Sequence, residues 1–253
     1  AAAALLVSPV CAAIDKAIAE AAAGEKTLWT SFFGSLRDIF GAPRAALRRP
    51  ELRYVSALFG GTYAINNAVC SVEQRRREPL PTAKTAIVFG GNTTLAIWKD
   101  AAFARLFGGA NAAATVPPPA YAAWAARDVV GMAVIFTLPP LVAPHLAKAT
   151  GLDDRRAESV AQFVLPLAVQ PVVAPFHQLG YLFSFKPTAP VGEHIRKALS
   201  RDIWNVIVAR WVRIFPPYCI GANVNKDVRH NFRAYLSLSN SSPGVARRET
   251  PPG

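Results

Sequence analysis

The stretch LFGGTYAINNAV at residues 58–69 is followed along the chain by VFGGNTTLAIW at residues 88–98. Both are apolar runs with a glycine pair inside, although glycine is a poor helix former. In a bilayer, helix association gains little from the hydrophobic effect, so small residues that let backbones approach closely become the packing device. The two runs therefore predict tightly packed membrane helices. The residues expected at their contacts are Gly60, Gly61, Ala64, Gly90 and Gly91. The alternative is that the glycines unwind the helix around an ion or a substrate, as in broken-helix transporters.

The composition supports a membrane protein. Of the 253 residues, 52% are hydrophobic and only 17% are charged, against about 25% charged residues in an ordinary soluble domain. The formal net charge is nevertheless +12. A basic chain rich in apolar runs favours contact with anionic lipid head groups, and no nucleic-acid motif accompanies the charge. A soluble helical bundle is the alternative, but the chain outside the apolar runs has too few polar positions to coat it.

Five apolar segments set the expected architecture. At about 1.5 Å per residue, helices of about 17–25 residues cover about 26–37 Å, which matches a bilayer core of about 30 Å. The segments are residues 54–72, 82–98, 121–142, 159–185 and 203–220. Pro166, Pro171 and Pro175 are expected to curve the fourth helix rather than divide it, because membrane helices tolerate proline kinks. Pro216 ends the fifth segment early, so both a span and an interfacial helix stay open for it.

The predicted fold is all-α: an integral membrane bundle of four to five kinked transmembrane helices with an N-terminal amphipathic interfacial helix. Residues 1–51 are expected to form an Ala-rich and amphipathic interfacial region, in which the aromatic residues of 28–41 recur at helical spacing. Residues 52–222 form the transmembrane bundle, and residues 223–253 form a polar tail. Lysine and arginine are spread about evenly over the loops, so the orientation is not predicted.

Polar residues inside the apolar segments are the candidate functional groups, because such residues normally face other protein, a cavity or head groups. The candidates for binding lipid or an acidic partner are Arg75, Arg76, Arg77, Arg210 and Arg213. The candidates for a substrate pathway are Asn66, Asn92, Gln170 and His177, although a lone histidine such as His177 is more often structural. Arg127 and Asp128 are adjacent, and adjacent residues do not face one another on a helix. They are therefore expected to be interface anchors rather than a catalytic pair.

Catalytic motifs are missing from the sequence. The three cysteines and four histidines show neither metal-ligand spacing nor a disulfide pattern. A phosphate loop, a nucleophile elbow and a dinucleotide fingerprint are also missing. We therefore expect no enzymatic activity, no metal and no cofactor, with a bound phospholipid such as cardiolipin as a candidate small molecule.

Two stretches carry a resemblance to a known family. RDVVGMAVIFTLPPLVAPHLAK (127–148) and AQFVLPLAVQPVVAPFHQLGYLFSFKP (161–187) resemble the carboxyl-terminal spans of sideroflexins, in which an arginine-led helix ends in a proline pair and a proline-rich helix follows. ARWVRIFPPYCIGANVNKDVR (209–229) is similar to uncharacterised multi-span mitochondrial proteins. The resemblance implies a location in the mitochondrial inner membrane.

Two function classes follow from these observations. In the first, the protein is a non-catalytic accessory subunit of a large inner-membrane complex, the respiratory chain or ATP synthase, and binds neighbouring subunits and anionic lipid. The alternative is a small-solute transporter for amino-acid-like compounds, of sideroflexin-like kind. A transporter should contain a cavity on which polar groups converge, whereas an accessory subunit should direct its polar groups at other chains or at lipid.

Overall fold

A computed structural model describes residues 2–76, 81–109 and 115–221, together with a few residues between 224 and 231. All regular secondary structure in these ranges is helical, so the predicted all-α membrane bundle is confirmed. In chain order the elements are α1 (Ala2–Ala23), α2 (Leu28–Gly41), α3 (Pro43–Ala46), α4 (Pro50–Arg76), α5 (Pro81–Phe107), α6 (Pro118–Thr150), α7 (Asp154–Ala168), α8 (Gln170–Phe185), α9 (Val191–Ala198), α10 (Ile203–Phe215) and the π-helix η2 (Pro216–Gly221). The predicted tail at 223–253 lies almost wholly outside the described residues.

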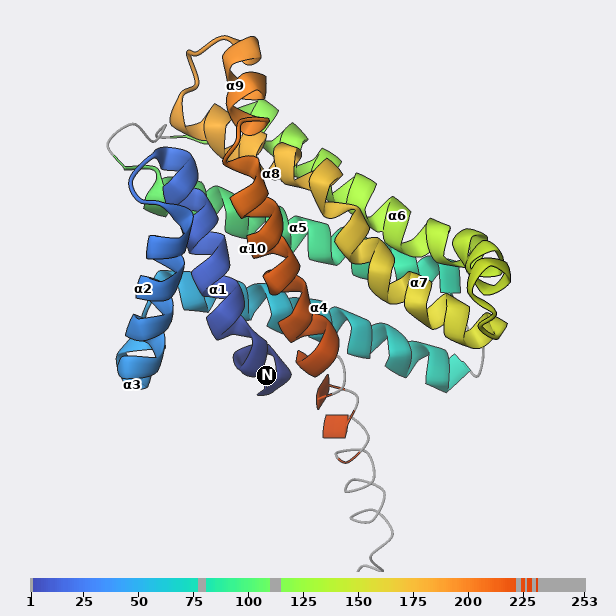
Figure 1. Cartoon of the computed structure of the whole chain (residues 1–253). Coiled ribbons are helices and arrows are strands. Elements are labelled where there is room, and N and C mark those ends of the chain that lie inside the picture. Colours follow the sequence, from blue (N-terminus) through green and yellow to red (C-terminus); the bar gives the residue numbers. More distant parts are fainter. Residues whose placement is uncertain are drawn as a thin grey trace, which may run out of the picture.

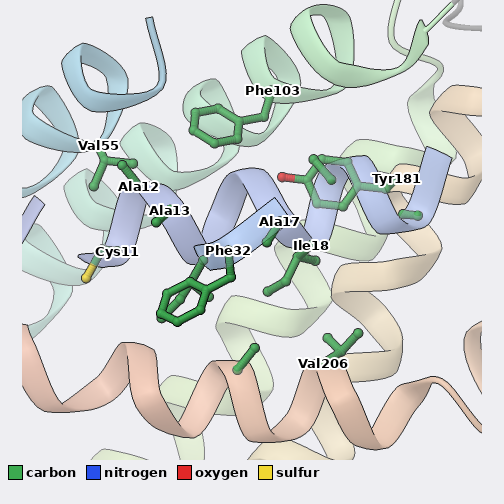
Figure 2. Close-up of a cluster of buried hydrophobic side chains, with 14 of the residues drawn as sticks. Cys11, Ala12, Ala13, Ala17, Ile18, Phe32, Val55, Phe103, Tyr181 and Val206 are labelled. Atoms are coloured by element: carbon green, nitrogen blue, oxygen red, sulfur yellow. The ribbon is translucent and has the colours of Figure 1, made fainter. Parts of the chain in front are cut away.

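The α1 helix lies between α2 and α10 (Figure 1) and is enclosed by other helices. It packs against α2, α4, α5, α8 and α10, and its Ala12, Ala13 and Ala17 are fully buried. Figure 2 shows side chains of other helices around it, among them Phe32, Phe103 and Val206. Alanine side chains let those helices approach α1 closely. The predicted boundary between 1–51 and 52–222 stays a prediction, but the central position of α1 was not foreseen.

Three helical stretches of the described chain are long and apolar enough to cross a membrane: Ala2–Ala23, Pro118–Thr150 and Asp154–Phe185. The second and third correspond to the third and fourth predicted segments. The α6 helix and the α7–α8 pair run side by side (Figure 1) and expose large apolar residues such as Val129, Leu141 and Phe163. Exposed apolar side chains at this density favour contact with lipid.

The prolines of the fourth segment produce a short interruption in the helix. The α7 helix ends at Ala168 and α8 begins at Gln170. Val169, between them, donates a backbone hydrogen bond to Leu165 (3.0 Å) and accepts one from Val173 (3.1 Å). The chain therefore continues in the same direction through the interruption, as the sequence predicted. The α10 helix has 13 residues and continues directly into η2, so the structure leaves both alternatives open for the fifth segment.

The first two glycine-rich segments are α4 and α5, which pack against each other. A Cβ at Gly61 would lie 2.6 Å from Leu95 Cδ1, and a Cβ at Gly91 would lie 2.5 Å from Ile65 Cδ1. These glycines therefore let each helix accept a side chain of the other. Gly60 faces Ala4 of α1, with its Cβ position 3.9 Å from that methyl group. By contrast, a Cβ at Gly90 would meet no atom of the described chain within 4 Å, and Ala64 is exposed. Among the described residues, Gly90 therefore makes no close contact with another helix, and the packing role of Ala64 stays a prediction.

Local capping explains several helix ends. Thr27 and Asp153 precede α2 and α7, and their side chains accept hydrogen bonds from the backbone of Thr30 and Arg156, as expected of N-cap residues. The α6 helix begins with proline in its first turn and ends before Gly151, which has a φ of 71°. That left-handed conformation is the usual glycine C-cap.

Candidate functional site

Six charged side chains from four helices form a continuous series of ion pairs, which we call the charge chain. It runs from Arg213 on α10 through Asp15 on α1, Lys99 and Asp100 on α5, and Arg127 to Asp128 on α6. Its contacts are Arg213 Nε to Asp15 Oδ1 at 2.6 Å, Lys99 Nζ to Asp15 Oδ2 at 2.7 Å, Lys99 Nζ to Asp100 Oδ1 at 2.7 Å, Arg127 Nη1 to Asp100 Oδ2, and Arg127 Nε to Asp128 Oδ1 at 2.7 Å. Cations and carboxylates alternate along its whole length.

The charge chain is buried at its centre. The side chains of Asp15 and Asp100 are 0% exposed, and that of Lys99 is 2% exposed. A buried charge is costly unless it is paired and hydrogen-bonded, and here each central charge has two partners of opposite sign. Three cations and three carboxylates balance, so the charge chain as a whole is neutral.

Arg210 lies beside the charge chain but has no carboxylate of its own. Its Nε donates to Gln170 Oε1 at 2.7 Å, and its Nη1 donates to His177 Nδ1 at 2.8 Å. Both acceptors are uncharged. Within the described chain, no carboxylate lies within 4.0 Å of the Arg210 guanidinium. Arg210 therefore adds one uncompensated positive charge to an otherwise neutral cluster.

The hydrogen bonds define the state of His177. A guanidinium only donates, so His177 Nδ1 must accept from Arg210, and the ring proton of the neutral imidazole lies on Nε2. Nε2 is 3.5 Å from Asp100 Oδ1 and makes no hydrogen bond within the described chain. Tyr181 donates to the same Asp100 oxygen at 3.2 Å. Asp100 thus joins charges from α5 and α6 to an aromatic pair on α8.

A cavity of about 100 Å³ adjoins this cluster. It is lined from α4, α5, α6, α8 and α10, and its lining contains four cations and two carboxylates, with a few apolar residues on α4 and α5. The charged lining residues are Lys99, Asp100, Arg127, Asp128, Arg210 and Arg213. Such a mixture of signs can hold a small solute that carries both charges. Among the described residues, no group of histidine, cysteine and carboxylate side chains could hold a metal.

Three of the four predicted substrate-pathway residues come together at this site. Asn92 and His177 line the cavity, and Gln170 holds Arg210, which also lines it. Asn92 also accepts a hydrogen bond from Thr62 at 3.1 Å. Asn66 is half-buried on α4 and is not among the lining residues.

The predicted lipid-binding arginines separate into two groups. Arg75 and Arg76 are exposed at the end of α4, where head groups could reach them, whereas Arg77 lies outside the described residues. Arg210 and Arg213 point into the protein instead. The carboxylate that binds Arg213 is Asp15 of the same chain, so a lipid or another subunit is not needed to pair it.

The premise that Arg127 and Asp128 do not face one another was wrong, whereas their role as interface anchors stays a prediction. Their side chains meet in a bidentate pair, with Nε to Oδ1 at 2.7 Å and Nη2 to Oδ2 at 2.9 Å. The rule that neighbours on a helix do not face one another applies to the Cβ directions. The long arginine side chain is flexible enough to curl back to the next residue.

Sequence reasoning also missed Asp15, Lys99 and Asp100, the centre of the charge chain. Asp15 lies in an Ala-rich helix assigned to a peripheral region, and Lys99 and Asp100 were taken as the end of a span. A usable signal existed, because Asp15 lies in a mainly apolar stretch of alanine, isoleucine, valine and cysteine. A carboxylate in such a stretch requires a cationic partner.

The chain was compared with known proteins. No curated protein and no solved structure matches it. Residues 1–233 match a protein family described as "Probable citrulline exporter". The match spans every helix described above and supports transport over the accessory-subunit hypothesis. By this match, the chain is a member of the probable citrulline exporter family of membrane proteins.

Proposed function

We propose that this protein exports citrulline, or a closely similar neutral amino acid, across a membrane, and that the cavity beside the charge chain is the substrate site. The observation that carries the proposal is the convergence of charges of both signs on one cavity inside a helical bundle. Ionisable groups inside such bundles mark substrate pathways because their burial is otherwise costly. An accessory subunit has no need of such a cavity.

The chemistry of citrulline suits this lining. The compound is a zwitterion with an α-carboxylate and an α-ammonium group, and its side chain ends in an uncharged ureido group. Cations such as Lys99 and Arg210 complement the carboxylate, and Asp128, whose side chain is 15% exposed, complements the ammonium group. Asn92, whose amide can donate and accept, is a fitting partner for the ureido group.

The size of the cavity indicates how transport would proceed. At about 100 Å³ it is smaller than the roughly 300–1,000 Å³ of typical ligand pockets, so the structure represents a closed state. Loading a solute requires α10 or α6 to move relative to α5. The ion pair of Asp100 with Arg127 joins α5 to α6. The pair of Asp15 with Arg213 joins α10 to α1, and Asp15 in turn pairs with Lys99 of α5, so these are the contacts that must loosen.

The direct test is efflux of radiolabelled citrulline from preloaded liposomes that contain the purified protein. We expect efflux from wild-type liposomes well above that from empty ones. Asp128→Asn should slow efflux at least about tenfold, because a charge-assisted hydrogen bond to the ammonium group is lost. The matched control is Asp38→Asn, which breaks an exposed pair with Arg49 away from the cavity. Wild-type efflux equal to that of empty liposomes would refute the proposal.

The mitochondrial inner membrane is the location that goes with this proposal. It is supported by the resemblance of residues 127–148 and 161–187 to mitochondrial proteins, and by the net charge of +12, which suits a cardiolipin-rich membrane. Exposed Arg75 and Arg76 are the residues proposed to contact lipid phosphate. Fractionation of cells that express a tagged protein tests the location. Recovery with the plasma membrane instead would contradict it.

A further inference from the structure

We infer that Arg210 is the residue that binds the carboxylate of the substrate, and that the same excess of positive charge excludes amino acids with a cationic side chain. The inference rests on the proposed function and deepens it, since it assigns the orientation of the solute and the class of solute accepted.

The first argument is the charge balance. The six members of the charge chain neutralise one another in pairs, whereas within the described chain Arg210 hydrogen-bonds to the uncharged Gln170 and His177 alone. A buried cation without a carboxylate is unfavourable, and an incoming carboxylate supplies the missing charge. The empty protein therefore keeps one position open for a single negative group.

The second argument is geometric. A guanidinium has five N–H donors, and two of them are used by Gln170 and His177. The second N–H of Nη1 and both N–H groups of Nη2 make no hydrogen bond in the described chain, and the residue lines the cavity. Gln170 and His177, the two neutral acceptors, fix the plane of the Arg210 guanidinium. Its remaining N–H donors are therefore oriented for bidentate contact with a carboxylate.

The third argument concerns the other end of the solute. The cavity lining holds Lys99, Arg127, Arg210 and Arg213 against Asp100 and Asp128. Asp15 pairs with Arg213 from outside the lining, so one cation, Arg210, is in excess. A zwitterion with an uncharged side chain places one positive charge near Asp128. Ornithine has a second ammonium group on its side chain. That group would lie near the cations of the lining without a carboxylate left to pair with it, and like charges in a poorly hydrated site repel strongly.

Competition measures both parts of the inference. Labelled citrulline uptake into liposomes is challenged with unlabelled citrulline, with citrulline carboxamide, which lacks the carboxylate, and with ornithine. We expect the carboxamide and ornithine to compete at least about tenfold more weakly than citrulline, as expected for loss of one charge-assisted contact. Equal competition by the carboxamide would overturn the carboxylate assignment, and equal competition by ornithine would overturn the charge filter.

Variants separate binding from folding. Arg210→Gln should raise the KM for citrulline about tenfold to a hundredfold. It should lower the melting temperature less than Arg213→Gln does, because the acceptors on Gln170 and His177 lose a donor but no carboxylate loses its partner. Arg210→Lys keeps the charge but not the fork and should give an intermediate KM. The matched control is Arg213→Gln, one helical turn away, which leaves Asp15 with Lys99 alone and should lower the melting temperature.

The outcomes distinguish the two proposals. If wild-type protein transports citrulline and Arg210→Gln has an unchanged KM, the assignment of Arg210 is wrong while the exporter function stands. If Arg210→Gln lowers the melting temperature as much as Arg213→Gln does, Arg210 is structural and the inference is also overturned. If wild-type protein transports none of the three compounds, the proposed function fails and the inference fails with it.

Discussion

Replacing Asp15 by asparagine should destabilise the whole bundle. Asp15 accepts from Arg213 Nε at 2.6 Å and Nη2 at 3.1 Å, and from Lys99 Nζ at 2.7 Å. The substitution keeps the shape of the side chain but leaves Arg213 without a carboxylate and Lys99 with Asp100 alone. Breaking a buried pair in this way costs about 3–5 kcal/mol. For a chain of this size, that loss corresponds to a fall in the melting temperature of about 6–20 °C.

The chain carries its own reporter for this measurement. Cys11 is fully buried on α1, and its thiol lies 3.7 Å from the carbonyl oxygen of Arg213. With Cys70 and Cys219 replaced by serine, a thiol-reactive dye in mild detergent should label Cys11 only when α1 separates from α10. Labelling against temperature then gives the melting curve of this contact.

Two comparisons make the result interpretable. Asp38→Asn removes an ion pair whose aspartate side chain is 51% exposed, and exposed pairs contribute at most about 1 kcal/mol, so its curve should stay near that of the wild type. Asp15→Asn combined with Arg213→Gln should recover part of the loss, because the double variant no longer buries an unpaired arginine. A melting temperature for Asp15→Asn equal to that of Asp38→Asn would refute the claim that the charge chain stabilises the bundle.

Two further substitutions probe the packing around the site. Gly180→Ala should lower the free energy of unfolding by about 1–3 kcal/mol through overpacking, because the added Cβ would overlap Nε1 of the fully buried Trp124. Gly90→Ala is the control, since its Cβ would meet no atom of the described chain within 4 Å and alanine favours the helix. Equal melting temperatures for the two glycine variants would contradict the packing. Tyr181→Phe removes the 3.2 Å hydrogen bond to Asp100 and should cost about 1.5 kcal/mol, measured by thermal unfolding in detergent; an unchanged melting temperature would mean that this bond contributes nothing.

Local pattern was enough to predict much of the fold. The apolar runs at 121–142 and 159–185 correspond to α6 and to α7–α8. They could be predicted because the length of an apolar run and the positions of its prolines are properties of one continuous stretch of sequence. The glycine spacing likewise pointed to the α4–α5 contact, although it could not separate Gly61 and Gly91 from Gly90. That distinction depends on how the two helices are rotated about their axes, which neighbouring residues do not determine.

The charge chain depended on information that is not local. Asp15 is 84 residues from Lys99 and 198 residues from Arg213 along the chain. The sequence around each charged residue therefore does not indicate its ion-pair partner. The α1 helix was overlooked for a related reason. Its alanines strongly favour a helix. Their burial, however, depends on which other helices pack around α1, and neighbouring residues in the sequence do not determine that. Asn92, Gln170 and His177 were found because polar residues inside apolar runs are rare enough to notice.

Solute protection of a thiol inside the cavity tests the central claim most directly. Ala96 lines the cavity, and Ala57 lines a separate groove beside Trp98. In protein free of its native cysteines, Ala96→Cys and Ala57→Cys are each treated with a small thiosulfonate reagent, with and without citrulline. The account predicts that citrulline slows modification of Ala96→Cys and leaves the rate for Ala57→Cys unchanged. Equal rates with and without citrulline at Ala96→Cys, in a variant that still transports citrulline, would contradict it.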